Sequence, residues 1–174
     1  IYKFRVILDS EQDDVFRDIL IREDSTFEDL HTAIVNAFVL DGQQMASFYK
    51  SDDDWNQGEE ISLFDVSYKD DQALVMAEVL LNEKINEPHQ RYLYVYDFLD
   101  MWTFFVELFA IEEEDANIAY PALGESIGKL PPKAPDKDWD VPTERPEGGK
   151  GFDIFEGDDS FDQFGDESEE DYYE

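Results

Sequence analysis

The sequence predicts an α+β fold: a compact mixed or antiparallel sheet with one or two packed helices, followed by a strap rich in proline and glycine and an acidic tail. Several short runs alternate apolar and polar residues, which predicts strands, and one run has the spacing of a packed helix. A change of composition after residue 119 sets the expected boundaries. They are a core domain at 1–119, a strap or linker at 120–149 and a tail at 150–174.

The first 21 residues predict a β-hairpin with a long loop. Apolar and polar side chains alternate from Tyr2 to Leu8, and a second apolar-rich run extends from Val15 to Ile21. A polar turn at 9–14 separates the two runs.

A helix is predicted to begin at the capping box Ser25-x-x-Glu28 and to stop at Asp41-Gly42. Its apolar side chains follow at helical spacing: Phe27, Leu30, Ile34, Ala37 and Phe38. His31 lies within this helix. Because the local sequence offers it no metal-binding or catalytic partner, it is expected to be a surface or boundary residue and not a ligand.

The pattern is weaker between the helix and residue 90. It predicts a short strand at 45–50, an acidic loop at 51–60, another strand at 61–68 and, less clearly, a helix at 76–83. Asp52-Asp53-Asp54 lacks the spacing of a calcium-binding loop, so the loop is expected to be solvated.

The densest apolar stretch, at 91–108, predicts a hairpin whose two strands are internal to the sheet. Its connection places Asp97 and Asp100 on either side of two large apolar residues. The aspartates either accept backbone hydrogen bonds in a tight turn or belong to a candidate ligand cleft formed by Tyr96, Asp97, Asp100 and Trp102. If both aspartates were buried and close together, one would have a raised pKa, and an enzyme would become the better interpretation.

The charge is strongly negative, with 45 acidic and 13 basic side chains and a net charge of −32. Such a field repels phosphate backbones and attracts basic surfaces, so direct nucleic-acid binding is not expected and a basic protein surface is the natural partner. Alternatively, the charge only keeps the protein soluble or suits a salty cytoplasm.

The sequence contains no cysteine and no apolar run of 18 residues, and its first residues already predict a strand. Disulfides, thiolate metal sites and a membrane span are therefore not expected, and we expect a cytoplasmic protein without a cofactor.

The tail intersperses aromatic residues among carboxylates, a composition typical of acidic interaction segments. The residues predicted to anchor it to a partner are Phe152, Phe155, Phe161, Phe164, Tyr172 and Tyr173. A purely solubilising tail is the alternative. Three lysines in the strap, Lys129, Lys133 and Lys137, form an island of positive charge.

The motif from Tyr94 to Trp102, with Tyr94-Val95-Tyr96-Asp97-Phe98 at its start, resembles the Tyr-x-Tyr-Asp-Phe-Gly-Asp-x-Trp motif of the plasmid pRiA ORF-three-like family. Small members of that family are often described as transposon passenger proteins. Leu30-His31, Pro131-Pro132 and Gly148-Gly149-Lys150-Gly151-Phe152 also match its pattern. The resemblance spans most of residues 1–155 and implies a mixed sheet with one or two helices.

Four departures from the family pattern fall at polar, metal-capable or glycine positions. Leu99 stands where the pattern has glycine, Phe104 where it has histidine and Leu130 where it has cysteine. Lys133-Ala134 stands where the pattern has Glu-Asp. These differences imply that any ligand or metal site of the family is absent here. The family has no assigned activity, so the resemblance implies a fold and not a chemistry.

The function expected from these observations is that of a non-enzymatic adaptor or accessory protein. It would dock on a basic surface of a machine for transcription, translation or recombination, such as RNA polymerase or the ribosome, with the tail as an anchor. The alternatives are a DNA-mimic inhibitor of a nucleic-acid-binding protein, or a small-ligand-binding or enzymatic domain with a site near Asp97 and Asp100. Mimicry requires carboxylates in duplex-like rows, which a sequence alone does not reveal.

Overall fold

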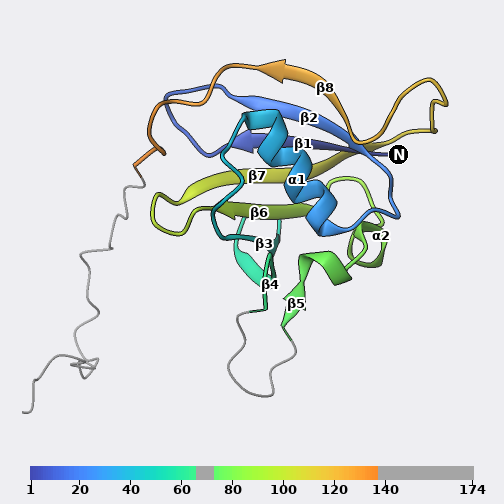
Figure 1. The fold of residues 1–174 in the computed structure, drawn as a ribbon, viewed down its shortest axis with the longest axis horizontal. Coiled ribbons are helices and arrows are strands. Elements are labelled where there is room, and N and C mark those ends of the chain that lie inside the picture. Colours follow the sequence, from blue (N-terminus) through green and yellow to red (C-terminus); the bar gives the residue numbers. More distant parts are fainter. Residues whose placement is uncertain (66–72, 137–174) are drawn as a thin grey trace, which may run out of the picture. The chain divides into compact units, whose positions relative to one another are not determined.

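An α-helix packs across one face of an eight-stranded sheet in this computed structural model, which describes residues 1–65 and 73–136 (Figure 1). The elements are β1 (Tyr2–Leu8), β2 (Phe16–Ile21), α1 (Phe27–Phe38), β3 (Ala46–Ser51), β4 (Gln57–Ser62), β5 (Leu74–Val75), the 3₁₀ turn η1 (Met76–Glu78), α2 (Leu81–Lys84), β6 (Arg91–Tyr96), β7 (Trp102–Ile111) and β8 (Ala122–Ile127). The strand order is β5-β4-β3-β6-β7-β1-β2-β8. Neighbouring strands are antiparallel except β4 and β5, which are parallel. The broad expectation of an α+β fold with a mixed sheet is confirmed.

The two predicted hairpins are confirmed as neighbouring antiparallel pairs. In the first, Arg5 of β1 lies opposite Asp18 of β2. In the second, Tyr96 of β6 lies opposite Trp102 of β7. Both strands of the second hairpin are internal, because β6 also pairs with β3 and β7 also pairs with β1. The face of these strands that is covered by α1 is apolar and buried, with Tyr94 and Phe104 on it, whereas the opposite face also carries Arg91 and Glu107, as an antiparallel sheet with one covered face allows.

The helix begins one residue later than predicted, so the expected capping box is wrong. Thr26 is the N-cap: its hydroxyl accepts the amide of Asp29 at 3.1 Å, and the Asp29 carboxylate accepts the amide of Thr26 at 2.9 Å. Ser25 is unavailable for this role because its carbonyl accepts the amide of Leu81 at 2.8 Å, which joins it to α2. The possible capping boxes that begin at Ser25 and at Thr26 overlap in the sequence, and only the contact with the distant α2 distinguishes them.

The acidic stretch at 51–60 is not wholly a loop, which corrects the sequence prediction. The turn is confined to 52–56, where Asp52 accepts the amides of Asp54 at 2.9 Å and Asn56 at 3.0 Å, and β4 begins at Gln57. Glu59 and Glu60 are tolerated in this strand because their side chains are exposed. The helix predicted at 76–83 is divided into η1 and α2, with an extended residue, Val79, after η1.

Part of the expected strap is an edge strand. Residues 122–127 form β8, which pairs antiparallel with β2, so the sheet extends beyond the boundary expected at residue 119. Pro121 and Gly128 lie just outside the strand, and the glycine inside it, Gly124, sits where a side chain would meet Leu20 at 3.1 Å. Proline and glycine at these places delimit the strand and do not abolish it.

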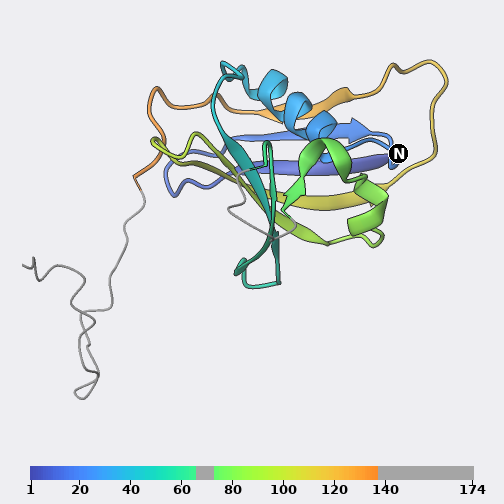
Figure 2. The same cartoon turned by 60° about the horizontal axis from the view of Figure 1, so that its bottom comes forward.

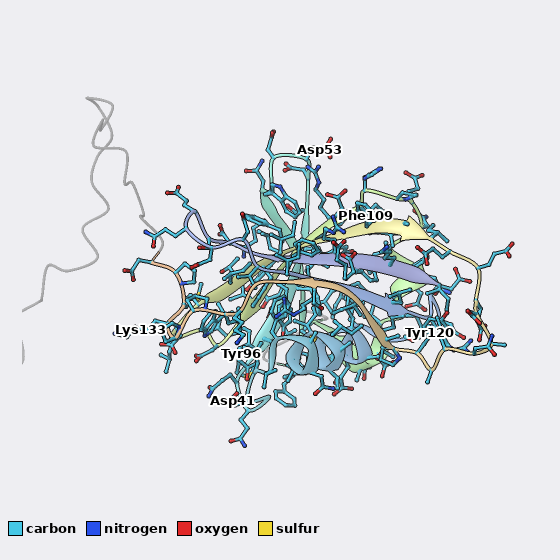
Figure 3. The ribbon with its side chains drawn as sticks, turned by 90° about the horizontal axis from the view of Figure 1, so that it is seen from above. Asp41, Asp53, Tyr96, Phe109, Tyr120 and Lys133 are labelled. Carbon is cyan, nitrogen blue, oxygen red and sulfur yellow. The ribbon has the colours of Figure 1, made fainter. Side chains whose placement is uncertain are left out.

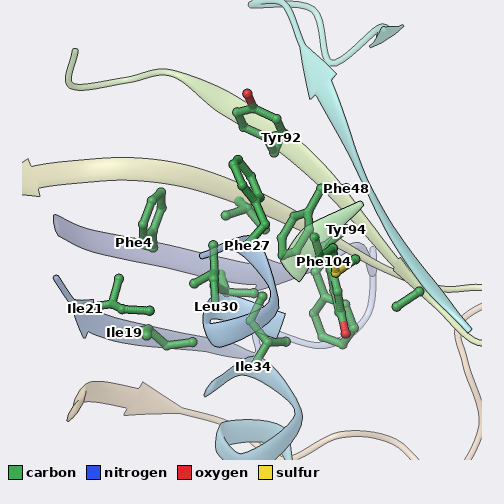
Figure 4. Close-up of a cluster of buried hydrophobic side chains, with 14 of the residues drawn as sticks. Phe4, Ile19, Ile21, Phe27, Leu30, Ile34, Phe48, Tyr92, Tyr94 and Phe104 are labelled. Atoms are coloured by element: carbon green, nitrogen blue, oxygen red, sulfur yellow. The ribbon is translucent and has the colours of Figure 1, made fainter. Parts of the chain in front are cut away.

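The core lies between the sheet and the layer formed by α1, η1 and α2 (Figure 2). Figure 4 shows its centre, where Phe27 packs edge-on against Phe48 with ring centroids 5.3 Å apart. Fully buried members include Phe4, Ile19, Ile21, Leu30, Ile34, Tyr92, Tyr94 and Phe104. We call the sheet face covered by α1 the inner face and the opposite one the outer face. None of the helices in the described residues is long and apolar enough to cross a membrane.

Candidate functional site

Four connecting segments meet at one end of the sheet, which we call the loop end: residues 9–15, 39–45, 97–101 and 128–136. The strand registers bring them together, because β1, β6 and β8 end there and β2, β3 and β7 begin there. The amide of Asp97 donates to the carbonyl of Met45 at 2.8 Å, which fixes two of these segments to each other. Asp41, Tyr96 and Lys133 mark this end in Figure 3.

Tyr96 connects the sheet to the loop after α1. Its hydroxyl donates a short hydrogen bond to the Asp41 carboxylate and accepts the amide of Gly42 at 2.8 Å. Burial, together with the Asp41 carboxylate, raises the pKa of Tyr96. The hydrogen bond from Tyr96, helped by the amide of Gln43, holds the pKa of Asp41 below its usual value. The phenol is therefore neutral and the carboxylate ionised at neutral pH.

A second polar pair lies in the core at His31. The residue is buried, contrary to the expectation of a surface or boundary position, and its Nδ1 is 2.7 Å from the Tyr94 hydroxyl. Burial lowers the pKa of His31 and raises that of Tyr94 well above its usual value. Both groups are thus neutral near pH 7, and each is the hydrogen-bond partner of the other. The pair therefore has a structural role in the core.

Asp97 and Asp100 form a turn and not a buried pair. The Asp97 carboxylate accepts the amides of Leu99 at 3.0 Å and Asp100 at 3.4 Å, and its carbonyl accepts the amide of Met101 at 2.6 Å. Asp100 is exposed. Of the four residues predicted to line a ligand cleft, Tyr96 and Trp102 are cross-strand neighbours, and Trp102 is half-buried against the core. The geometry satisfies Asp97 internally, so it gives no sign of a catalytic pair.

The loop end concentrates unusual backbone conformations. Five of the seven positive φ angles in the described residues occur there: Val39, Gly42, Asp97, Met101 and Gly128. Val39 is the least expected, because a β-branched residue is strained at its φ of 57°. It caps the helix, and the amide of Leu40 donates to the carbonyl of Val35 at 2.9 Å. The helix therefore ends at Phe38 with Val39 as its C-cap, before the stop predicted at Asp41-Gly42.

Two large apolar side chains of the loop end are almost fully exposed. Leu99 is 92% exposed and Val39 is 87% exposed, the highest values of any large apolar residue in the described parts of the chain. Phe98, next to Leu99, is 41% exposed. The sequence drew attention to Leu99, one of the two large apolar residues between Asp97 and Asp100, but Val39 was not singled out. The backbone amide of each is hydrogen-bonded: that of Val39 to the Asn36 carbonyl and that of Leu99 to the Asp97 carboxylate.

The model of the plasmid pRiA4b ORF-3-like protein family matches residues 1–136, which is more than half of the chain. The chain belongs to this family. Among solved structures, a protein of unknown function from Methanosarcina mazei Go1 is similar, with a TM-score of 0.59 and 21% sequence identity over 72% of this chain and 67% of the other. At that identity the likeness shows the fold alone. No curated protein matches the chain.

The family match covers the whole loop end, including the turn at 97–101. Phe98 and Leu99 are the two exposed large apolar side chains in this turn.

The loop end is rich in carboxylates. The loop end contains Asp9, Glu11, Asp13, Asp14, Asp41, Asp97, Asp100 and Asp136, against Lys129 and Lys133. Acidic side chains are also found at the other end of the sheet, between residues 22 and 29 and between 112 and 115. Negative charge alone therefore does not distinguish the loop end from the opposite end of the sheet. The loop end is distinguished by negative charge together with the nearly complete exposure of Val39 and Leu99.

The outer face of the sheet carries charges of alternating sign. Arg5 binds the fully buried Asp18 through two hydrogen bonds of 2.8 and 2.9 Å, and its guanidinium lies 4.4 Å from the ring centroids of both Phe16 and Phe109. On the neighbouring strands, Arg91 lies 3.3 Å from the carboxylate of Glu107. The cross-strand registers place these residues in the order Asp18, Arg5, Glu107, Arg91. Neighbouring charges in this row have opposite signs and compensate each other. The row therefore does not resemble the uniformly negative phosphates of a nucleic-acid strand.

The structure describes no metal centre: residues 1–65 and 73–136 contain no group of three or more His, Asp and Glu side chains that could hold an ion. The predicted anchors in the tail, which are Phe152, Phe155, Phe161, Phe164, Tyr172 and Tyr173, lie outside the described residues, as does Lys137.

Proposed function

We propose that this protein is a non-enzymatic adaptor whose loop end binds a basic surface of a partner protein. The observation that carries the proposal is the 92% exposure of Leu99 on a turn that Asp97 fixes with its own carboxylate. A turn does not need an apolar residue at that place, and burying a leucine on a partner is worth about 1.5–3 kcal/mol. Val39 supplies a second apolar anchor at the same end.

The charges around these anchors favour a basic partner. Eight carboxylates of the loop end would steer a positively charged surface toward it, and such steering accelerates association in a way that salt weakens. Basic protein surfaces are most common on machines that handle nucleic acid, such as RNA polymerase, the ribosome or a recombinase. The acidic-aromatic tail at 150–174 follows the loop end in the sequence after residues 137–149, and it has the same combination of charge and apolar residues.

The two alternatives have less support. A DNA mimic needs rows of like charge, whereas the outer face alternates Asp18, Arg5, Glu107 and Arg91. A catalytic site near Asp97 needs a free carboxylate, whereas Asp97 accepts backbone amides of its own turn.

The proposal is tested by capture from native cell extract with the full chain, using Leu99→Ser and the matched control Ile111→Ser. Ile111 is also an exposed aliphatic residue, but it lies at the opposite end of β7. We expect the wild-type chain and the control to retain the same basic protein at low salt, and Leu99→Ser to lose most of it. Equal retention by all three chains, or retention of no basic protein, would overturn the proposal.

A further inference from the structure

β8 is an open edge of the sheet. It is the last strand in the order and pairs with β2 on one side, while no strand of residues 1–65 or 73–136 pairs with its other side. Figure 1 shows β8 at the outermost position, and Figure 3 looks onto this edge from above. An open edge offers unpaired backbone amides and carbonyls, which are a template for another strand.

The segment around β8 is nearly uncharged in a chain of net charge −32. Between Ala116 and Gly128 the only charged side chain is Glu125, whose carboxylate lies 3.3 Å from the guanidinium of Arg5. The same segment exposes large apolar residues: Leu123 is 54% exposed and Ile127 is 44% exposed. The edge therefore lacks the clustered charges that would keep a second acidic molecule away.

β8 is also held firmly against the rest of the fold. The Arg17 guanidinium donates to the carbonyl of Ile127 at 2.7 Å and to that of Gly128 at 2.9 Å. Gly128 itself has a φ of 73° and leaves no room for a side chain, because a Cβ there would lie 2.3 Å from the Asp14 carbonyl. A strand fixed in this way can accept a neighbour with little loss of conformational entropy.

We propose that β8 pairs antiparallel with β8 of a second copy of this chain, which makes a twofold dimer whose two sheets become continuous. A twofold axis makes the interface self-complementary, since the same nearly neutral edge faces itself. A second copy fits this surface better than a basic partner does, because the only carboxylate in the segment is already paired. This interface is separate from the loop end and does not depend on the adaptor function.

The pairing has a defined geometry. If all six residues of β8 pair, Leu123 of one copy lies opposite Ser126 of the other. The two Leu123 Cα atoms are then about 11 Å apart, from a strand rise of about 3.4 Å per residue and a strand spacing of about 4.8 Å. Leu99, at the loop end, is outside this interface.

The first experiment measures the mass of the full chain by sedimentation over a range of protein concentrations. We expect a monomer–dimer equilibrium whose dimer fraction increases with added salt, because salt screens the repulsion between two chains of net charge −32. Capture of a basic partner at the loop end should show the opposite salt dependence. A chain that is monomeric at all concentrations and at both low and high salt would overturn the dimer but leave the adaptor function standing.

Two variants with the same change of charge locate the interface. Leu123→Glu places like charges near each other across the edge and should weaken the dimer at least about tenfold, while Leu99→Glu should leave it unchanged. Circular dichroism establishes that both variants are folded. An equal effect of the two variants would indicate repulsion between whole molecules and would overturn pairing at β8. If the chain is monomeric but binds another protein, and Leu123→Glu abolishes that binding, the edge belongs to that protein and the dimer is overturned.

Spin labels give a distance for the same interface. The chain has no cysteine, so Leu123→Cys provides a single attachment point. Labels on Leu123→Cys should report a distance consistent with Cα atoms about 11 Å apart, and labels on Leu99→Cys a clearly longer one. A dimer in which the Leu123 labels are farther apart than the Leu99 labels would overturn the proposal.

Discussion

Tyr96 and Asp41 are joined by a hydrogen bond that links the end of β6 to the loop after α1. The same phenol accepts the amide of Gly42, so one side chain fixes the loop at two points. Neither residue adds exposed apolar surface to the loop end. Their contribution is to keep the loop that begins at Val39 in a single conformation.

Replacing Tyr96 with phenylalanine should therefore destabilise the protein. The substitution removes a hydrogen bond to a carboxylate and leaves the Gly42 amide without its acceptor, and the expected loss in free energy of unfolding is about 1.5–3 kcal/mol. Urea denaturation of the two proteins measures this difference. Asp41→Asn, which keeps an acceptor for the phenol, should cost less. A Tyr96→Phe protein as stable as the wild type would show that water replaces both bonds.

Val39→Gly should stabilise the protein while weakening partner capture. Glycine adopts a φ of 57° without strain, and removing a β-branched residue from this conformation should raise the free energy of unfolding by about 1 kcal/mol. Val39→Ala is the control, because it removes most of the apolar side chain but retains a Cβ. Thermal unfolding and extract capture provide the two measurements. A gain in stability with full retention of the partner would mean that Val39 is not an anchor.

The pH dependence of stability should report on His31. Burial lowers its pKa in the folded state, so below about pH 6.5 the unfolded chain binds a proton that the folded chain does not. The stability from the neutral, buried His31 is complete above that pH and is lost as the pH falls toward the folded-state pKa. His31→Gln can still pair with Tyr94 but does not titrate. Comparing the free energy of unfolding at pH 7.5 and 5.5 should show a smaller decrease for the variant, and an equal decrease would contradict the assignment.

Asp18→Asn should be strongly destabilising, whereas Glu125→Gln should not. Both carboxylates contact Arg5, but Asp18 is fully buried and Glu125 is exposed. Removing the buried charge leaves the half-buried Arg5 without its main partner and should cost about 2–3 kcal/mol. Removing the exposed charge should cost less than about 1 kcal/mol. Chemical denaturation of both variants provides the comparison, and similar losses would mean that solvent screens the two pairs equally.

The sequence was most informative where a local pattern is compatible with only one kind of secondary structure. The two hairpins at 2–21 and 91–108 followed from alternation, and the family motif around Tyr96 agreed with them. The helix start was ambiguous by one residue, because Ser25 and Thr26 each stand three residues before an acid. Only the bond between Ser25 and the distant Leu81 decides between them.

Sequence reasoning missed β8, which is an edge strand, and the start of β4, which is next to the other edge. β4 contains two glutamates and β8 contains a glycine between flanking proline and glycine, features that are unfavourable in a central strand but tolerated at or near an edge. Tyr96 and Trp102 are cross-strand neighbours, which follows from the hairpin predicted at 91–108, while the ligand cleft expected around them stays a prediction. Asp41 was recognised only as a helix stop, because its bond to Tyr96 joins residues 55 positions apart.

The pairing of β1 with β7 has a consequence for how the protein is made. Lys3 lies opposite Ala110, so the middle of the sheet joins two strands that are more than a hundred positions apart in the sequence. On the ribosome, β1 and β2 can form their hairpin early, but one edge of β1 has no partner until β7 has left the exit tunnel. Such distant pairing is intrinsically slow to form. The early hairpin must therefore remain soluble by itself until β7 has been synthesised.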